Sequence, residues 1–246
     1  MKKIRWGILG TGRIARAFAE GLKNTSNGYL NAVGSRSQDS AQSFANEWNV
    51  PHFFDSYSQL ANSSKIDAIY IATPHTEHTT NAITCMENGK AVLCEKPLSM
   101  NATETMALID LSRKNNTLLM EAFMYKIHPQ TNEIINLVSK RLKGPLNIQA
   151  EFCFSVEVPE THRLVNKELG GGSILDIGCY PASISRYIVG SVNNKAFMNP
   201  ISLVGEGELN NQGIDLNASA SLKFADGSIA EIKSATNFVS ESNVTI

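Results

Sequence analysis

Three residues have side chains suited to proton transfer at a hydroxyl group, namely Lys96, Asp176 and Tyr180. Lys96 directly follows a short apolar run, so it is expected where a strand ends. Asp176 and Tyr180 are four residues apart, and such a pair points the same way on a helix. An isolated tyrosine has a pKa of about 10, so it needs a cation such as Lys96 nearby to act near neutral pH. A surface lysine, a capping aspartate and a core tyrosine are the plainer explanations.

A second group of residues, at the start of the chain, could bind a phosphate. Residues 10–15 have the pattern Gly-x-Gly-x-x-Ala between an apolar run and an amphipathic run. In a strand–turn–helix unit the first glycine permits a tight turn, the second lets the backbone approach a pyrophosphate, and the helix N-terminus faces its charge. Ordinary turn glycines are the alternative. The cofactor-binding residues predicted here are Gly10, Thr11, Gly12, Arg13 and Ile14.

The end of the next apolar run bears on which dinucleotide would bind. Folds that bind NAD place an acidic residue there to hold the ribose 2′-hydroxyl, whereas this chain has Ser35 and Arg36. A hydroxyl and a guanidinium suit a 2′-phosphate, which favours NADP over NAD. Asp39 is the nearest carboxylate and could partly restore NAD binding. A solvated Arg36 with loose selectivity between the two cofactors is the alternative.

Another polar segment follows the next strongly apolar run and contains Thr73, Pro74, His75 and His78. It is expected at the carboxyl edge of a sheet, where such folds bind ligands. We predict that these residues cap a helix or contact the cofactor. No third ligand accompanies the two histidines, so no metal site is predicted. Plain helix-start residues are the alternative.

The segment Glu95-Lys96-Pro97 follows a further apolar run and is expected at the same edge. The ammonium group of Lys96 could bind a substrate oxygen or lower the pKa of a nearby acid. Glu95 could hold a ribose or orient Lys96. The simpler explanation is a surface lysine at a strand end, followed by a turn proline.

The composition is that of a globular chain with little net charge. Its 246 residues are 42% hydrophobic and 18% charged, with a formal net charge of −1. Nothing here indicates a nucleic-acid or membrane partner, and no apolar stretch is long enough to span a bilayer. The four cysteines lack metal-ligand spacing and indicate free thiols in a reducing compartment, so a cytoplasmic protein is expected.

The elements that must position these residues alternate through the first half of the chain. Alternating apolar strands and amphipathic helices predict an α/β fold with a doubly wound parallel sheet covered on both faces. The expected strands are Ile4–Leu9, Tyr29–Ser35, His52–Phe54, Ile66–Ala72, Ala91–Cys94 and Leu118–Ala122. The expected helices are Arg13–Lys23, Ser37–Trp48, Tyr57–Ala61, His78–Asn88 and Thr103–Lys114.

The pattern changes after about Met124, so we divide the chain into residues 1–123 and 124–246. The second part is expected to be an α+β domain, an antiparallel sheet with a helix on one face. Its predicted helices are His128–Lys143 and a segment from about Gly172 to Gly190. Its predicted strands are Pro145–Val156, Ile201–Leu209, Leu216–Phe224, Ser228–Ser234 and a last one from Asn243.

The combination of these motifs resembles the Gfo/Idh/MocA oxidoreductase family over essentially the whole chain. The motifs, in chain order, are the loop 10–15, Ala72-Thr73-Pro74 with His78, Glu95-Lys96-Pro97, residues 121–125 and residues 170–180. The family pairs a Rossmann domain with a domain built on an open, mostly antiparallel sheet. Many members have histidine where this chain has Tyr180, which is similar to the dihydrodiol and aldose dehydrogenase branch.

The resemblance implies a dehydrogenase that transfers a hydride between NADP or NAD and a sugar, polyol or related alcohol. It implies that Lys96 is the catalytic-site lysine and that Asp176 and Tyr180 lie beside the substrate. We expect Tyr180 to exchange the hydroxyl proton, Lys96 to lower the tyrosine pKa, and Asp176 to orient substrate or lysine. A ligand-sensing or regulatory protein without turnover is the rival. A methyl-transferring Rossmann enzyme is disfavoured by Glu95-Lys96-Pro97 and the second sheet.

Two expectations concern the whole protein. An open sheet has a second face that one set of helices cannot cover, so we expect a homodimer or higher homo-oligomer formed through it. Family members usually exceed 300 residues, so the resemblance implies that the second domain is incomplete after Ile246 and lacks some strands.

Overall fold

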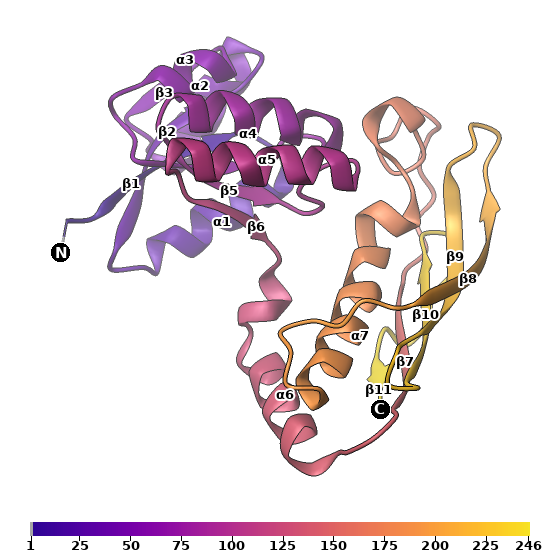
Figure 1. The fold of residues 1–246 in the computed structure, drawn as a ribbon. Helices are drawn as coiled ribbons and strands as arrows, with labels where there is room; N and C mark the ends of the chain where they lie inside the picture. The colour runs from indigo at the N-terminus through magenta and orange to yellow at the C-terminus, as the bar shows by residue number, and fades with distance from the viewer. Residues whose placement is uncertain (1) are drawn as a thin grey trace. The chain divides into compact units, whose positions relative to one another are not determined.

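The computed structural model describes residues 2–246, which form two compact units. The first unit ends at Ala122 and the second is Phe123–Ile246. Figure 1 shows the first as a sheet between helices, in indigo to magenta, and the second as helices beside a twisted sheet, in pink to yellow. Among residues 2–246, no helix has the length and apolar character needed to cross a membrane.

The first unit contains a six-stranded sheet in the order β3-β2-β1-β4-β5-β6, with every neighbouring pair parallel. Because β1 is central and the chain winds outwards from it in both directions, the expected doubly wound fold is confirmed. The strands are β1 (Ile4–Leu9), β2 (Gly28–Gly34), β3 (His52–Phe54), β4 (Ala68–Ile71), β5 (Ala91–Glu95) and β6 (Leu119–Ala122). The helices are α1 (Arg13–Lys23), α2 (Gln38–Trp48), α3 (Tyr57–Asn62), α4 (His78–Glu87) and α5 (Ala102–Asn115), with a 3₁₀ turn η1 (His75–Glu77).

Two apolar clusters cover the two faces of this sheet. On one face Leu60, Met86 and Leu108 bring α3, α4 and α5 against strand residues such as Ile69 and Ile71. The cluster on the other face brings α1 and α2 against the sheet through small alanines and one large ring, Ala15, Ala19 and Phe44. Small residues at the start of α1 let it pack closely on β1, which holds the preceding glycine turn in place.

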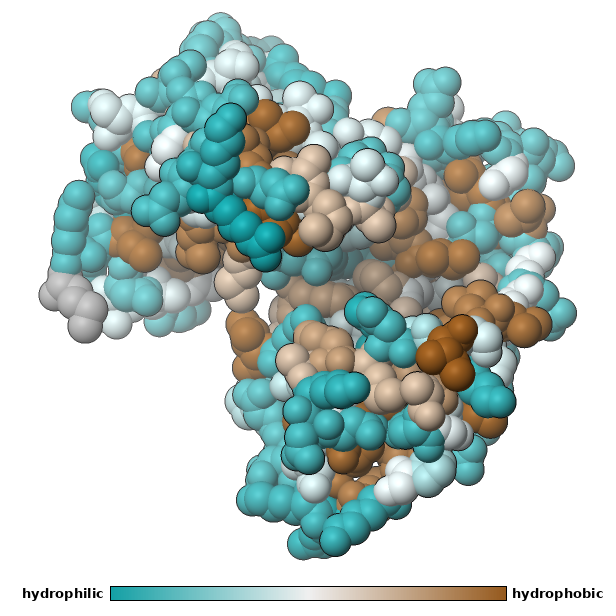
Figure 2. Space-filling view, in the orientation of Figure 1, coloured by the Kyte–Doolittle hydropathy of each residue, from teal (hydrophilic) through white to brown (hydrophobic). Residues whose placement is uncertain are grey.

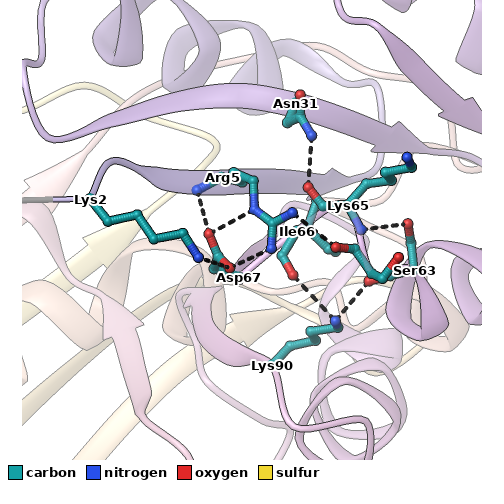
Figure 3. A network of polar contacts seen from close by, with 9 residues as sticks. Lys2, Arg5, Asn31, Ser63, Lys65, Ile66, Asp67 and Lys90 are labelled. Carbon is teal, nitrogen blue, oxygen red and sulfur yellow. Dashed lines mark hydrogen bonds and ion pairs between the residues drawn. The ribbon is translucent and has the colours of Figure 1, made fainter.

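A polar network braces the amino edge of the sheet, opposite the glycine turn (Figure 3). Arg5 donates to both carboxylate oxygens of Asp67, from Nε at 3.0 Å and from Nη2 at 2.7 Å. Lys90 donates to the carbonyl oxygens of Ser63 and Ile66 at 2.7 and 3.2 Å. These contacts tie β1 and the start of β5 to the segment that enters β4.

The second unit has two helices on one face of a five-stranded sheet in the order β11-β7-β10-β9-β8. Its core joins α6, α7 and the sheet through Val138, Ile188, Ile148 and Leu222. Its helical elements are η2 (Met124–Ile127), α6 (Pro129–Arg141), η3 (Lys167–Leu169), the π turn η4 (Ile174–Gly178) and α7 (Cys179–Val192). Its strands are β7 (Asn147–Cys153), β8 (Ser202–Leu209), β9 (Asp215–Lys223), β10 (Ile229–Ala235) and β11 (Val244–Thr245).

Two local expectations for this unit need correction. The sheet is not wholly antiparallel, because β10 runs parallel to β7 between antiparallel pairs. The long connection from β7 through α7, β8 and β9 permits this pairing, and no local pattern encodes it. The segment containing Asp176 is a π turn rather than the first turn of a continuous α-helix. The sheet is therefore mixed and mostly antiparallel, as the family resemblance implies.

The face of this sheet away from the helices is polar. Ser221 of β9 donates to Glu231 of β10 at 2.7 Å, and the next outward residue on β10 is Lys233. At the sheet edge β8 is exposed along its whole length. Its region carries exposed apolar side chains, and Figure 2 shows brown patches among teal ones there. They are Ile201, Leu203, Val204 and Leu209.

Candidate active site

The glycine turn between β1 and α1 has the geometry of a close backbone approach. Gly10 has φ +97°, and a side chain there would place Cβ 2.7 Å from the carbonyl oxygen of Ala72. Its N–H donates to the carbonyl of Gly34 at 2.9 Å. Gly12 precedes α1 with open space where a Cβ would be, and no side chain caps the helix. The first N–H groups of α1 are thus left for another acceptor, as phosphate binding requires.

The predicted loop residues beyond the glycines differ in exposure. Arg13 is exposed at the start of α1, whereas Thr11 and Ile14 are half-buried. The carbonyl oxygen of Thr11 accepts a hydrogen bond from Nη1 of Arg16 at 2.5 Å. That bond joins the loop to the first turns of α1.

The end of β2 places Ser35 and Arg36 beside a cavity. Ser35 is buried and donates its N–H to the carbonyl of Phe54 at 3.1 Å. Arg36 projects outwards, with Nη1 3.0 Å from Oε1 of Glu77 in η1. The cavity has a volume of about 370 Å³ and is lined by Leu9, Arg36, Asp55, Ser56, Tyr57, Ser58, Thr80, Asn81, Thr84 and Cys85. A guanidinium at the rim of such a cavity is suited to binding an anionic group.

His78 connects two loops at the carboxyl edge of the sheet. It is fully buried, and its two ring nitrogens lie 2.9 Å from the carbonyl oxygen of Thr73 and 2.8 Å from that of Pro97. Burial lowers the pKa of His78, although both carbonyl contacts raise it. His75 is buried as well, with its ring 5.7 Å from that of His78. His78 therefore fixes the Glu95-Lys96-Pro97 loop to the loop after β4.

The residues around Lys96 are anchored from two sides. The hydroxyl of Tyr70 on β4 donates to Glu95 Oε1, and the N–H of Lys96 donates to Glu95 Oε2 at 3.3 Å. The N–H of Leu98 donates to Glu121 on β6 at 2.9 Å. The Glu95 carboxylate is thus turned towards its neighbouring strand and orients the loop that carries Lys96. Pro74 lies half-buried between Thr73 and His75.

In the second unit, Asp176 forms a buried ion pair. It lies in the π turn η4, is 7% exposed and accepts from Nη1 of Arg163 at 3.1 Å. The guanidinium partner holds the buried carboxylate in a defined orientation. Such a group can accept a hydrogen bond from a substrate hydroxyl.

Tyr180 lies at the start of α7 within a cluster of aromatic rings. Its ring centroid is 4.8 Å from that of Phe123, 5.5 Å from Phe152 and 5.9 Å from Tyr125. The hydroxyl of Tyr125 in turn shares a hydrogen bond with Ser183 at 2.7 Å, and burial raises the pKa of Tyr125 to about 12. Tyr125 therefore stays neutral near pH 7.

Asp215 of β9 holds the turn that carries Asp176. Its Oδ2 accepts from the hydroxyl of Ser173 at 2.8 Å and from the N–H of Ile174 at 2.7 Å. Gly172 has φ +117°, and a Cβ there would lie 2.2 Å from Oδ1 of Asp215. The carboxylate thus occupies the space of a missing side chain and caps the turn η4.

Comparison with known proteins bears on both units. Residues 4–123 match the family described as "Oxidoreductase family, NAD-binding Rossmann fold", and residues 137–246 match the Gfo/Idh/MocA C-terminal domain. The chain belongs to the Gfo/Idh/MocA oxidoreductase family. The six-stranded Rossmann sheet and the mixed sheet therefore belong to the two domains of this family.

Named relatives of this Gfo/Idh/MocA chain include trans-1,2-dihydrobenzene-1,2-diol dehydrogenase of Xenopus tropicalis, 37% identical over 90% of this chain and 66% of the relative. D-xylose 1-dehydrogenase (NADP(+)) 2 of Haloferax volcanii is 30% identical over 94% of this chain and 69% of the relative. A solved 3-ketoreductase of Actinomadura kijaniata, in complex with NADP and TDP-benzene, has a TM-score of 0.87 at 25% identity and covers 99% of this chain and 73% of that one. The chain spans about two thirds of the length of these relatives.

Within this Gfo/Idh/MocA chain the structure gathers the predicted residues in two groups. The loop 10–14, Ser35, Arg36, the Thr73–His78 segment and Glu95-Lys96 follow β1, β2, β4 and β5 at one edge of the Rossmann sheet. Asp176 and Tyr180 belong to the second unit, and their pairing with Lys96 stays a prediction. Sequence reasoning missed three charged residues that hold predicted ones, namely Glu77, Arg163 and Asp215. Among these three, only Glu77 has a signal in the sequence, because it directly precedes His78, a predicted site residue.

Proposed function

We propose that this chain forms the cofactor- and substrate-binding part of a dehydrogenase that transfers a hydride between a nicotinamide cofactor and a CH–OH carbon. The observation that carries the proposal is the juxtaposition, at one sheet edge, of the uncapped glycine turn with Arg36 and Glu95-Lys96. Ligands bind at this edge in doubly wound folds. The nicotinamide supplies the hydride chemistry when bound, and the protein supplies position and electrostatic field.

The proposed cofactor is NADP, with NAD as a second choice. Gly10, Gly12 and the first N–H groups of α1 would receive the pyrophosphate, and Arg36 the 2′-phosphate. Ser35 is buried with its N–H already bonded, so Arg36 is the stronger of the two selecting residues. The named Haloferax volcanii relative is an NADP(+) enzyme, which supports this choice.

The proposed acid–base group is the Tyr180 hydroxyl. Lys96 would lower its pKa and bind the same substrate oxygen, and Asp176, oriented by Arg163, would hold a neighbouring hydroxyl. The rings of Phe123 and Phe152 around Tyr180 provide an apolar surface for the carbon skeleton. An aromatic wall beside a carboxylate suits a cyclic diol, a sugar or a polyol, and the names of the relatives fit this class.

The test is turnover followed at 340 nm. The protein is incubated with NADP⁺ or NAD⁺ and a panel of sugars, polyols and cyclic diols, and in the reverse direction with NADPH and the matching carbonyls. The unaltered protein should form reduced cofactor with at least one alcohol. The Lys96→Met variant should not form it. Lys140→Met, an exposed lysine near the end of α6, is the matched control. Cofactor binding by calorimetry without turnover on any substrate would favour the ligand-sensing alternative.

Assembly and location belong to the same proposal. We propose a homo-oligomer formed through the polar sheet face that carries Ser221, Glu231 and Lys233. We propose a cytoplasmic protein, because Cys85, Cys94 and Cys153 are buried free thiols of the kind kept in a reducing compartment.

A further inference from the structure

An ion pair joins Arg36, the proposed 2′-phosphate ligand, to Glu77. The two side chains meet at 3.0 Å from Nη1 to Oε1, and Glu77 is the less exposed, at 30% against 70% for Arg36. The backbone of Glu77 is fixed, because its N–H donates to the carbonyl of Pro74 at 2.9 Å. Arg36, as the more exposed partner of the pair, therefore has the more room to reorient towards a ligand.

Tyr57 belongs to the same group of side chains. The pKa of Tyr57 is raised by burial and by the negative charge of Glu77, and Arg36 opposes that shift by its charge and a hydrogen bond. Arg36 and Tyr57 both line the cavity of about 370 Å³, and Asp55 is another of its lining residues. The pocket beside Arg36 is thus rich in acceptors and has one cation, Arg36, among its lining residues.

A 2′-phosphate and a 2′-hydroxyl meet this arrangement differently. The phosphate has to compete with Glu77 for the guanidinium and comes close to a like charge, which opposes binding. A 2′-hydroxyl brings no charge and leaves the Arg36–Glu77 pair intact. We propose that Glu77 is a specificity-determining residue that acts through Arg36, weakening the binding of 2′-phosphorylated dinucleotides so that the site accepts both NADP and NAD. This inference rests on the proposed function.

The experiment is calorimetric titration of the protein with NADP⁺, NAD⁺ and adenosine 2′,5′-bisphosphate. The variants are Glu77→Gln, Arg36→Met and the double variant. Glu20→Gln is the matched control, since it removes a carboxylate from the exposed Glu20–Lys23 pair on α1. Glu77→Gln should tighten binding of NADP⁺ and the bisphosphate by roughly 3- to 30-fold, as expected for removing a competing pair and a like charge. NAD⁺ should change by less than about twofold, because its ribose carries no phosphate.

The double variant separates the mechanism from a general charge effect. With Arg36→Met in place, Glu77→Gln should give less than half of its original gain in NADP⁺ affinity. An equal gain in that background, or unchanged or weaker NADP⁺ binding by Glu77→Gln alone, would overturn the inference while leaving the proposed function standing. If the wild-type protein and all variants bind neither dinucleotide, both proposals fail.

Discussion

At the scale of single residues, we predict that Arg36 determines the choice of cofactor. Arg36→Asp should weaken NADP⁺ binding by about 1–3 kcal/mol, because a charge-assisted contact is lost and a carboxylate repels the 2′-phosphate. NAD⁺ binding should be retained, since a carboxylate can accept from the 2′-hydroxyl. Calorimetric affinities for both cofactors provide the measurement. Equal affinities in the wild-type protein and the variant would remove Arg36 as the selector.

Lys96 and Tyr180 are expected to behave as one catalytic unit. Tyr180→Phe should preserve cofactor binding, because only a hydroxyl is lost from the aromatic cluster, and should reduce turnover by about 10²–10⁴. Lys96→Met should be comparably damaging, and the double variant little worse than either single one. The pH profile of alcohol oxidation in Tyr180→Phe should lose its basic limb. Losses that multiply in the double variant would show that the two residues act independently.

At the scale of elements, we expect Asp215 to hold the turn η4 in place, and with it the side chain of Asp176. Asp215→Asn keeps the shape of the side chain but replaces the carboxylate, which accepts hydrogen bonds from Ser173 and Ile174, with a neutral amide. We expect a raised KM for the alcohol and an unchanged Kd for the cofactor, because Asp176 is displaced while the glycine turn is untouched. Asp110→Asn, an exposed residue on α5, is the matched control. A lower kcat with unchanged KM would argue against a role in substrate positioning.

The Arg5–Asp67 pair makes the stability of the Rossmann sheet depend on pH. Hydrogen bonds and charge from Arg5 hold the pKa of Asp67 well below its ordinary range. Its contribution is therefore complete above the unfolded-state pKa of about 3.9 and is lost as the pH falls below it. Asp67→Asn should lower the thermal midpoint at pH 7 and change it less and less towards pH 3. A pH-independent difference between the two proteins would contradict this assignment.

Most of these elements could be predicted from sequence patterns, whereas contacts between distant segments could not. Strands such as β1 and helices such as α1 follow from local apolar periodicity, and the predicted bounds Ile4–Leu9 and Arg13–Lys23 agree with the structure. The Asp176–Arg163 pair was not predictable, because Arg163 lies in a loop without periodicity. The parallel pairing of β10 with β7 depends on a long crossover and has no local signal either.

At the scale of the whole molecule, the polar sheet face is the expected site of assembly. A face built from residues such as Glu231 and Lys233 would pair by complementary charge, so we expect a dimer that weakens as salt increases. Lys233→Glu should shift the equilibrium towards monomer, and Lys140→Glu on α6 should leave it unchanged. Light scattering at micromolar concentration, at low and high salt, measures both. A monomer under all conditions would rule out this interface.

The position of Ala72 against Gly10 has a consequence for synthesis on the ribosome. The predicted phosphate loop is made before β4, yet a Cβ on its first glycine, Gly10, would lie 2.7 Å from the carbonyl oxygen of Ala72, and the N–H of Ala72 donates to the carbonyl of Leu9 at 2.8 Å. β1 can pair with β2 as soon as β2 has been made, but the loop can pack against Ala72 only once β4 has been made as well. A nascent chain arrested before β4 should therefore fail to retain a dinucleotide, and one released after β5 should begin to do so. The predicted loop is thus completed only by a strand that follows it in the chain.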